Sequence, residues 1–105
     1  MKIIWQTNAK NGKAQVSSYI YRHFGIKRLK QFKQEVDRSV KMLMLHPNMG
    51  IMDPLFANRP MAYRSIIING LSKMVYCVDN DKETINIVAF WDTRREPKSQ
   101  ADQVK

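Results

Sequence analysis

The sequence predicts one α+β domain of two layers, in which a pair of helices packs on one face of an antiparallel sheet. Two segments in the first half repeat apolar residues at helical spacing, and three segments in the second half alternate like strands between tight turns. Neither the helices nor the strands can bury their apolar faces by themselves, so we expect the helical pair to pack against the sheet. The chain has 105 residues, 44% of them hydrophobic, which suffices for one core.

The first half begins with a short strand and a helix. Lys2–Trp5 is apolar and partly β-branched, which is typical of a strand. Thr7 or Asn8 can cap the helix that follows, because a short side-chain oxygen accepts hydrogen bonds from the free amides of the first turn. Gly25 lies where a left-handed C-terminal cap is expected. The residues at helical spacing are Ala9, Val16, Tyr19, Ile20 and Phe24.

A second helix is predicted from Lys27 to Leu45. Its apolar residues step by three or four and mark a single face, while most of its basic residues fall elsewhere. Pro47 ends this helix, because proline disfavours the α conformation at the residue before it. The apolar face consists of Leu29, Phe32, Val36, Val40 and Leu43.

The second half predicts an irregular connection over Ile51–Pro60 and then three antiparallel strands. Asn69 and Gly70 favour the positive φ angles of a two-residue hairpin turn. The order of elements is therefore strand, helix, helix, strand, strand, strand, and the place of the opening strand in the sheet stays open. The three predicted strands are Met61–Ile68, Leu71–Val78 and Thr84–Trp91.

The domain is expected to span residues 1–97, followed by a polar C-terminal tail over 98–105. The tail has no hydrophobic periodicity, so we expect it to fray, or to become ordered only on a partner, rather than to pack. Phe90 and Trp91 are neighbours on a strand and point to opposite faces, so only one of them should be core. Tyr76 is expected to pack in the core, half-buried. Four methionines suit either an adaptable contact surface or core filling: Met42, Met44, Met49 and Met52.

The charge of the chain is strongly positive and unevenly placed. Eighteen Lys and Arg against nine Asp and Glu give a formal charge of +9. Residues 1–50 hold ten of the basic side chains and only two acidic ones, Glu35 and Asp37. Such a surface attracts phosphate backbones or an acidic protein, and it is equally consistent with a solvated helix face.

Several classes of protein are excluded by what the sequence lacks. No apolar run reaches the roughly 18 residues of a membrane span, and the start of the chain turns polar too early for a signal peptide. Cys77 is the single cysteine, and His23 and His46 are the only histidines, so neither a disulfide framework nor a zinc site is expected. We therefore expect a cytoplasmic protein with no membrane contact, no metal and no cofactor.

Several short motifs accompany this order of elements. They are Trp5 with Ala9, Tyr19-Ile20, His46–Gly50, Tyr63-Arg64-Ser65, Met74–Asp79 and Phe90–Pro97. Together, over residues 1 to about 97, they resemble the RelE/ParE superfamily of bacterial type II toxins. The resemblance implies a basic toxin that inhibits growth, is neutralised by an acidic cognate antitoxin and forms a hetero-oligomer with it.

The superfamily contains two activities. RelE-like toxins cleave messenger RNA in the ribosomal decoding site, whereas ParE-like toxins bind and block DNA gyrase without cleaving RNA. By motif, Arg64, Lys73 and Arg94 match basic residues that RelE-like toxins use in catalysis. However, no Tyr or His follows Arg95 to transfer protons, and Ile66 stands where a second basic residue is usual.

The motifs Pro47–Gly50 and Tyr63-Arg64-Ser65 look more like the ParE-like branch, so a noncatalytic gyrase inhibitor is favoured. A ribosome-dependent mRNA endonuclease is the alternative, and a basic nucleic-acid-binding module without toxicity is a further one. The candidates for binding a target or phosphate are Lys30, Lys33, Lys41, Trp91 and Arg95. The three candidate catalytic residues could instead be ordinary cross-strand partners of Asp79, Asp92 or Glu96.

Overall fold

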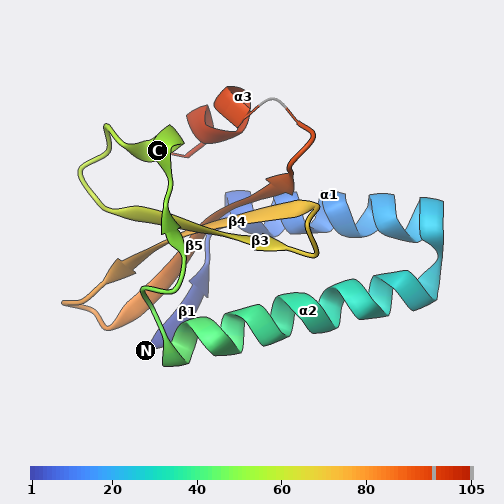
Figure 1. The fold of residues 1–105 in the computed structure, drawn as a ribbon, viewed down its shortest axis with the longest axis horizontal. Helices are drawn as coiled ribbons and strands as arrows, with labels where there is room; N and C mark the ends of the chain where they lie inside the picture. Colours follow the sequence, from blue (N-terminus) through green and yellow to red (C-terminus); the bar gives the residue numbers. More distant parts are fainter. Residues whose placement is uncertain (96, 105) are drawn as a thin grey trace.

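The computed structural model describes residues 1–95 and 97–104. Figure 1 shows a long α-helical hairpin beside a twisted sheet. Glu96, named above as a candidate ion-pair partner, and Lys105 lie outside the described residues. In chain order the elements are β1 (Lys2–Trp5), α1 (Thr7–Phe24), α2 (Ile26–Leu45), β2 (Ile51–Met52), the 3-10 helix η1 (Pro54–Phe56), β3 (Tyr63–Ile68), β4 (Ser72–Asp79), β5 (Thr84–Asp92) and α3 (Pro97–Asp102).

The five strands form one sheet in the order β1-β5-β4-β3-β2. The neighbours from β5 to β2 are antiparallel, whereas β1 pairs with β5 in parallel at the edge of the sheet. Asn69 and Gly70 both have positive φ, at 56° and 67°, which confirms the predicted hairpin turn between β3 and β4. The predicted α+β class and its order of elements are therefore confirmed, and β2 is a short edge strand within the stretch predicted to be irregular.

The two long helices begin and end differently from one another. Gln6 precedes α1 and no side chain caps its first turn; the amide of Asn8 instead donates to the carbonyl of Val88. The predicted cap by Thr7 or Asn8 is therefore wrong. Gly25 ends α1 at the predicted position and leads directly into α2. Its φ of 86° is positive as predicted, but its ψ of −178° lies outside the left-handed helical region.

The main core lies between the helical hairpin and the sheet. Helix α1 approaches β5 so closely that a Cβ at Gly12 would lie 1.9 Å from the carbonyl oxygen of Phe90. The lack of a side chain at Gly12 is what permits this contact between helix and strand. The buried residues of this core are Ala9, Val16, Phe32, Val36, Leu43, Ile68, Met74, Tyr76, Ile85, Ile87 and Phe90.

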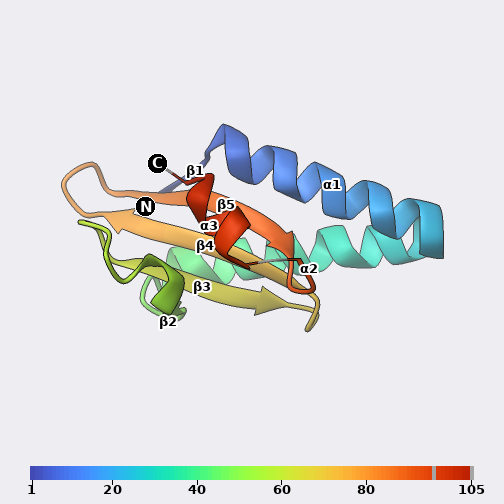
Figure 2. The same ribbon diagram turned by 90° about the horizontal axis from the view of Figure 1, so that it is seen from above.

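A second, smaller core covers the opposite face of the sheet. Helix α3 lies over this face (Figure 2), and Ala101 and Val104 are only 5% and 7% exposed. The guanidinium of Arg59 holds the segment by donating hydrogen bonds to the carbonyls of both residues. The prediction that the tail frays rather than packs is therefore wrong for residues 98–104, because this second sheet face is apolar and requires a cover.

Trp91 belongs to the second core and is 3% exposed, while Phe90 in the first core is 2% exposed. The prediction that only one of the two aromatic residues is core is therefore wrong, for the same reason: both faces of the sheet are covered. In the described part of the chain, no helix is long and apolar enough to cross a membrane.

Candidate functional site

Arg64 lies on β3 and faces the helical side of the sheet. It pairs across the strands with Tyr76, whose side chain is in the main core. Its guanidinium donates to the carbonyl of Gly50 at 2.8 Å and, more weakly, to that of Asn48 at 3.4 Å. Arg64 therefore holds the loop that follows α2, and its hydrogen-bond partners are carbonyls rather than the acidic residues considered from the sequence.

Lys73 lies on β4 and faces the opposite side of the sheet. Its Nζ is 2.6 Å from Oδ2 of Asp53 and 5.4 Å from the ring centroid of Trp91. The Asp53 side chain is fully buried, and its other oxygen accepts a hydrogen bond from the amide of Leu55. Burying a carboxylate is costly unless it is paired, so Lys73 has a structural role as the partner of Asp53. A lysine that binds phosphate would instead be free of such a partner.

Arg94 follows β5, on the helical side of the β3–β4 hairpin end. Its Nη2 is 2.6 Å from Oδ2 of Asp92, and its Nε is 3.0 Å from Oδ1. The guanidinium also lies 5.2 Å from the ring centroid of Tyr19. These hydrogen bonds from Arg94 lower the pKa of Asp92, and Asp92 in turn raises the pKa of Arg94. Asp92 is therefore the partner of Arg94, one of the pairings the sequence left open.

The three candidate catalytic residues do not converge on one site. Lys73 pairs across the strands with Ile67, which lies three residues after Arg64 on β3. At the rise of a strand, the positions of Arg64 and Ile67 are about 10 Å apart. An odd separation also places the two side chains on opposite faces of the sheet. Arg94 lies beyond the far end of β5 and is engaged by Asp92. In the described structure these residues therefore form no common pocket for a scissile phosphate.

Tyr76 is not available for proton transfer. Its side chain is fully buried, its hydroxyl donates to the carbonyl of Pro47 at 2.7 Å, and it accepts from the amide of Gly50 at 2.9 Å. Burial raises the pKa of this phenol, only partly opposed by the Gly50 hydrogen bond and the charge of Arg64. The predicted packing role is confirmed, and burial is complete rather than partial.

Arg95 is exposed, and its Nη1 donates to Oε1 of Gln15 at 3.3 Å. It lines a polar cavity of about 160 Å³ between α1 and α3, together with Asn8, Asn11, Gln15, Gln100 and Gln103. Trp91 also borders this cavity, yet its burial leaves too little surface for a nucleobase to stack on it. Of the two residues predicted at this end of the sheet, Arg95 is the one that solvent reaches.

The three lysines predicted on the second helix are all exposed on α2. Lys30, Lys33 and Lys41 lie within about 80° of one another around the helix, at 100° per residue. No described acidic residue forms an ion pair with any of them. The hairpin over 7–45 holds nine Lys and Arg against Glu35 and Asp37, so its outer surface is the polycationic part of the molecule.

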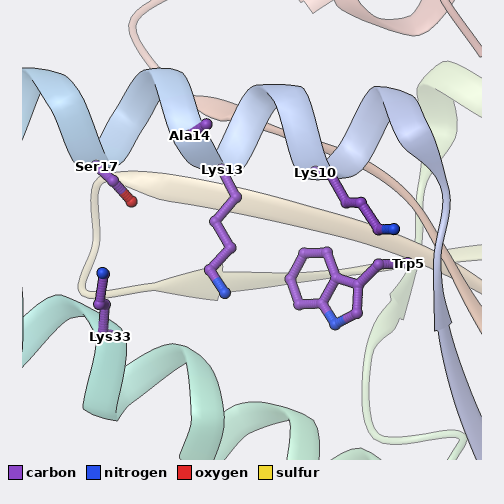
Figure 3. Close-up of a pocket in the computed structure, with 6 residues that line it drawn as sticks. All are labelled: Trp5, Lys10, Lys13, Ala14, Ser17 and Lys33. Atoms are coloured by element: carbon purple, nitrogen blue, oxygen red, sulfur yellow. The ribbon is translucent and has the colours of Figure 1, made fainter.

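Lys33 also borders an open groove between α1 and α2 that sequence reasoning did not identify. The groove has a volume of about 530 Å³, and its walls carry three lysines and a tryptophan (Figure 3). The spacing of Lys10, Lys13 and Ser17 along one face of α1 could have indicated this groove. Trp5 of β1 and Lys33 of α2 come close to that face only when the chain folds. The lining residues are Trp5, Lys10, Lys13, Ala14, Ser17 and Lys33.

An exposed apolar strip runs from the C-terminal end of α2 to the edge strand β2. Leu45 and Ile51 are each 71% exposed, and β2 offers an unpaired outer edge. The four methionines singled out from the sequence are at least 40% exposed, so of the two alternatives left open they lie on the surface rather than fill the core. The strip comprises Met42, Met44, Leu45, Met49, Ile51, Met52 and Leu55.

Comparison with known proteins gives a likeness of fold. No family model matches the sequence, and no curated protein matches it. Among solved structures, a chain of the "Chromosomal ParDE TA system from P. aeruginosa" is similar, with a TM-score of 0.68 and 17% sequence identity. The match covers 88% of this chain and 95% of that chain. At this identity the likeness concerns the fold, and it confirms the fold class predicted from the sequence.

Proposed function

We propose that this chain is the toxin of a type II toxin–antitoxin module and that it acts as a ParE-like, noncatalytic inhibitor of DNA gyrase. The observation that carries the proposal is the fold, which matches a chain of a ParDE system over most of both lengths. The motifs of the sequence point to the same superfamily independently of that match.

The separation of the basic residues supports a noncatalytic toxin. RNA cleavage through the 2′-hydroxyl requires a base, an acid and cations around one phosphate. Lys73 neutralises a buried carboxylate, Arg64 holds a loop on the other face, and Arg94 is paired with Asp92. Tyr76, the tyrosine nearest to Arg64 in the sheet register, is buried with its hydroxyl engaged on both sides. Blocking a protein target requires no such constellation.

Two surfaces support an acidic protein partner, the proposed antitoxin. The apolar strip at β2 leaves several large side chains exposed beside an unpaired strand edge, and such patches usually mark a protein interface. The neighbouring α2 carries the lysines that acidic residues of the partner would contact. An amphipathic, acidic chain matches both surfaces at once and would form a hetero-oligomer with the toxin.

The experiment that tests this function is controlled expression in bacteria. Induction should stop growth, and co-expression of a small acidic protein encoded beside this gene should restore it. Plasmids from arrested cells should lose negative supercoiling while messenger RNA stays intact. Cleaved messenger with normal supercoiling would instead support the RelE-like endonuclease, and unchanged growth would support the non-toxic nucleic-acid-binding module.

The target-binding residues are proposed to be Lys30, Lys33, Lys41 and Arg95. Replacing the three lysines by glutamine should weaken growth arrest while leaving the fold intact, because all three side chains are exposed. Replacing Lys2 and Lys82 by glutamine, at exposed positions on other elements than α2, should leave growth arrest unchanged and serves as the control. A loss of growth arrest in proportion to the number of lysines replaced, three against two, would show that net charge alone matters, rather than this helix face.

A further inference from the structure

The groove between α1 and α2 is lined by three lysines and one tryptophan. Lys10 and Lys13 extend from α1, Lys33 extends from α2, and Trp5 comes from the end of β1 (Figure 3). In that view the amines of Lys10 and Lys13 lie on either side of the indole, and Lys33 points across the groove toward α1. The Nζ of Lys13 is 4.8 Å from the ring centroid of Trp5.

This cluster of charge is uncompensated by the residues that surround it. The groove has no acidic residue in its lining, and among described residues none of the three lysines forms an ion pair. The helix that supplies two of them, α1, contains no acidic residue at all. Bringing like charges together is unfavourable, and an anion bound between them would relieve that repulsion.

The indole supplies a second kind of recognition. Trp5 is partly exposed, and it packs against Phe90 of the main core with ring centroids 6.3 Å apart. It is thus a fixed aromatic surface at one end of a basic groove. An aromatic side chain beside phosphate-binding cations is the combination by which proteins hold nucleotides, with the base stacked and the phosphates paired.

We propose that this groove binds a single nucleotide, with its base on Trp5 and its phosphates on Lys10, Lys13 and Lys33. The volume of about 530 Å³ falls within the usual range for small-molecule sites. The lining of α1 runs from Lys10 to Ser17, about 10 Å at the rise of a helix, which suits one nucleoside triphosphate rather than a strand. The hydroxyl of Ser17 adds a polar group at the far end from Trp5.

The test is isothermal titration of the full chain with three probes at one salt concentration: ATP, inorganic tripolyphosphate and a single-stranded decanucleotide. ATP should bind more tightly than tripolyphosphate by roughly 5- to 150-fold, the usual gain from stacking one base. Binding to tripolyphosphate equal to that of ATP would overturn the role of the indole. Groove-dependent binding of the decanucleotide without binding of ATP would overturn the assignment to a single nucleotide.

Two charge-matched variants locate the site. Lys13→Gln with Lys33→Gln should weaken ATP binding at least about 10-fold, because both charge-assisted contacts are lost. Lys2→Gln with Lys82→Gln removes the same charge from exposed positions outside the groove and should change affinity by less than about 2-fold. Equal losses would overturn the site in favour of a general field effect. Trp5→Leu, checked for folding by circular dichroism, should abolish the preference for ATP over tripolyphosphate.

This site does not depend on the proposed toxin function. Absence of growth arrest would leave the titrations unaffected, and absence of ATP binding would leave the gyrase proposal standing. A negative result in one experiment therefore does not count against the other proposal.

Discussion

Replacing Tyr76 by phenylalanine removes one hydroxyl that joins the loop after α2 to the centre of the sheet. In the native structure this hydroxyl accepts a hydrogen bond from the amide of Gly50 and donates one to the carbonyl of Pro47. The ring itself is fully buried, so phenylalanine fills the same space. The change therefore isolates the two hydrogen bonds from the packing of the ring.

The loss of stability depends on how exposed to water the two hydrogen-bond partners, Gly50 and Pro47, are. Gly50 is buried, so its amide is left without a partner, which costs about 1–3 kcal/mol. Pro47 is partly exposed and can reach water, so its lost bond costs about 1 kcal/mol. The free energy of unfolding should therefore fall by about 2–4 kcal/mol. With an unfolding entropy of about 0.2 kcal/mol/K for 105 residues, Tm should fall by about 10–20 °C.

The assay is thermal and urea unfolding followed by circular dichroism, with Tyr63→Phe as the control. Tyr63 is also buried, at 8% exposure, and its ring packs on Phe56, but its hydroxyl has no hydrogen-bond partner among described residues. Its replacement should cost less than about 1 kcal/mol. If Tyr76→Phe costs no more than Tyr63→Phe, the hydroxyl does not hold the loop and the reasoning fails.

Three further changes test other parts of the fold. Gly12→Ala should destabilise the protein by at least about 1–3 kcal/mol in urea unfolding, despite a better helix propensity, because its Cβ would overlap the backbone of β5. A neutral or stabilising result would show that α1 can move away from the sheet. Lys73→Met should cost about 3–5 kcal/mol, since it leaves the buried side chain of Asp53 without its ion-pair partner. A stable variant that loses toxicity would contradict this structural role. Asp92→Asn should lower stability slightly at neutral pH, because the pair with Arg94 lowers the pKa of Asp92 and so stabilises the fold above the unfolded pKa of about 3.9. The difference from the native chain should disappear as pH falls through the lowered folded pKa, and a difference that persists in acid would refute the ion-pair explanation.

Local patterns were sufficient to predict most of the architecture. Lys2–Trp5 is a strand, Gly25 ends the first helix, and Asn69-Gly70 forms the hairpin turn, because each depends on the conformational preferences of neighbouring residues. Helical spacing identified the buried face of α2 for the same reason. The parallel pairing of β1 with β5 depends on contacts more than 80 residues apart, which no local pattern contains.

The C-terminal segment was mispredicted because its composition is polar and only two of its residues matter for packing. Ala101 and Val104 are three apart and cover the second face of the sheet, while Arg59 binds their carbonyls from a distant loop. That spacing was visible, but a two-residue apolar pattern carries little weight without knowledge of the uncovered sheet face. The same uncovered face explains why both Phe90 and Trp91 are buried.

The types of residue in the candidate site could be predicted from the sequence, but their arrangement in space could not. Exposed basic residues on α2 and after β5 were identified from charge and motif. The separation of Arg64 from Lys73 on opposite faces, and the pairing of Lys73 with Asp53, depend on strand register and on the path of a loop. Trp5, Lys13 and Lys33 likewise come from three elements that meet only in the folded chain.

We propose that a basic surface of this chain binds DNA gyrase without catalysing a reaction. The most direct measurement is the supercoiling of relaxed plasmid by purified gyrase in the presence of increasing amounts of this protein, with messenger RNA on programmed ribosomes assayed in parallel. Supercoiling should fall in proportion to the protein added, replacing Lys30, Lys33 and Lys41 should relieve this inhibition, and messenger RNA should stay whole. Full supercoiling together with cleaved messenger RNA would contradict it.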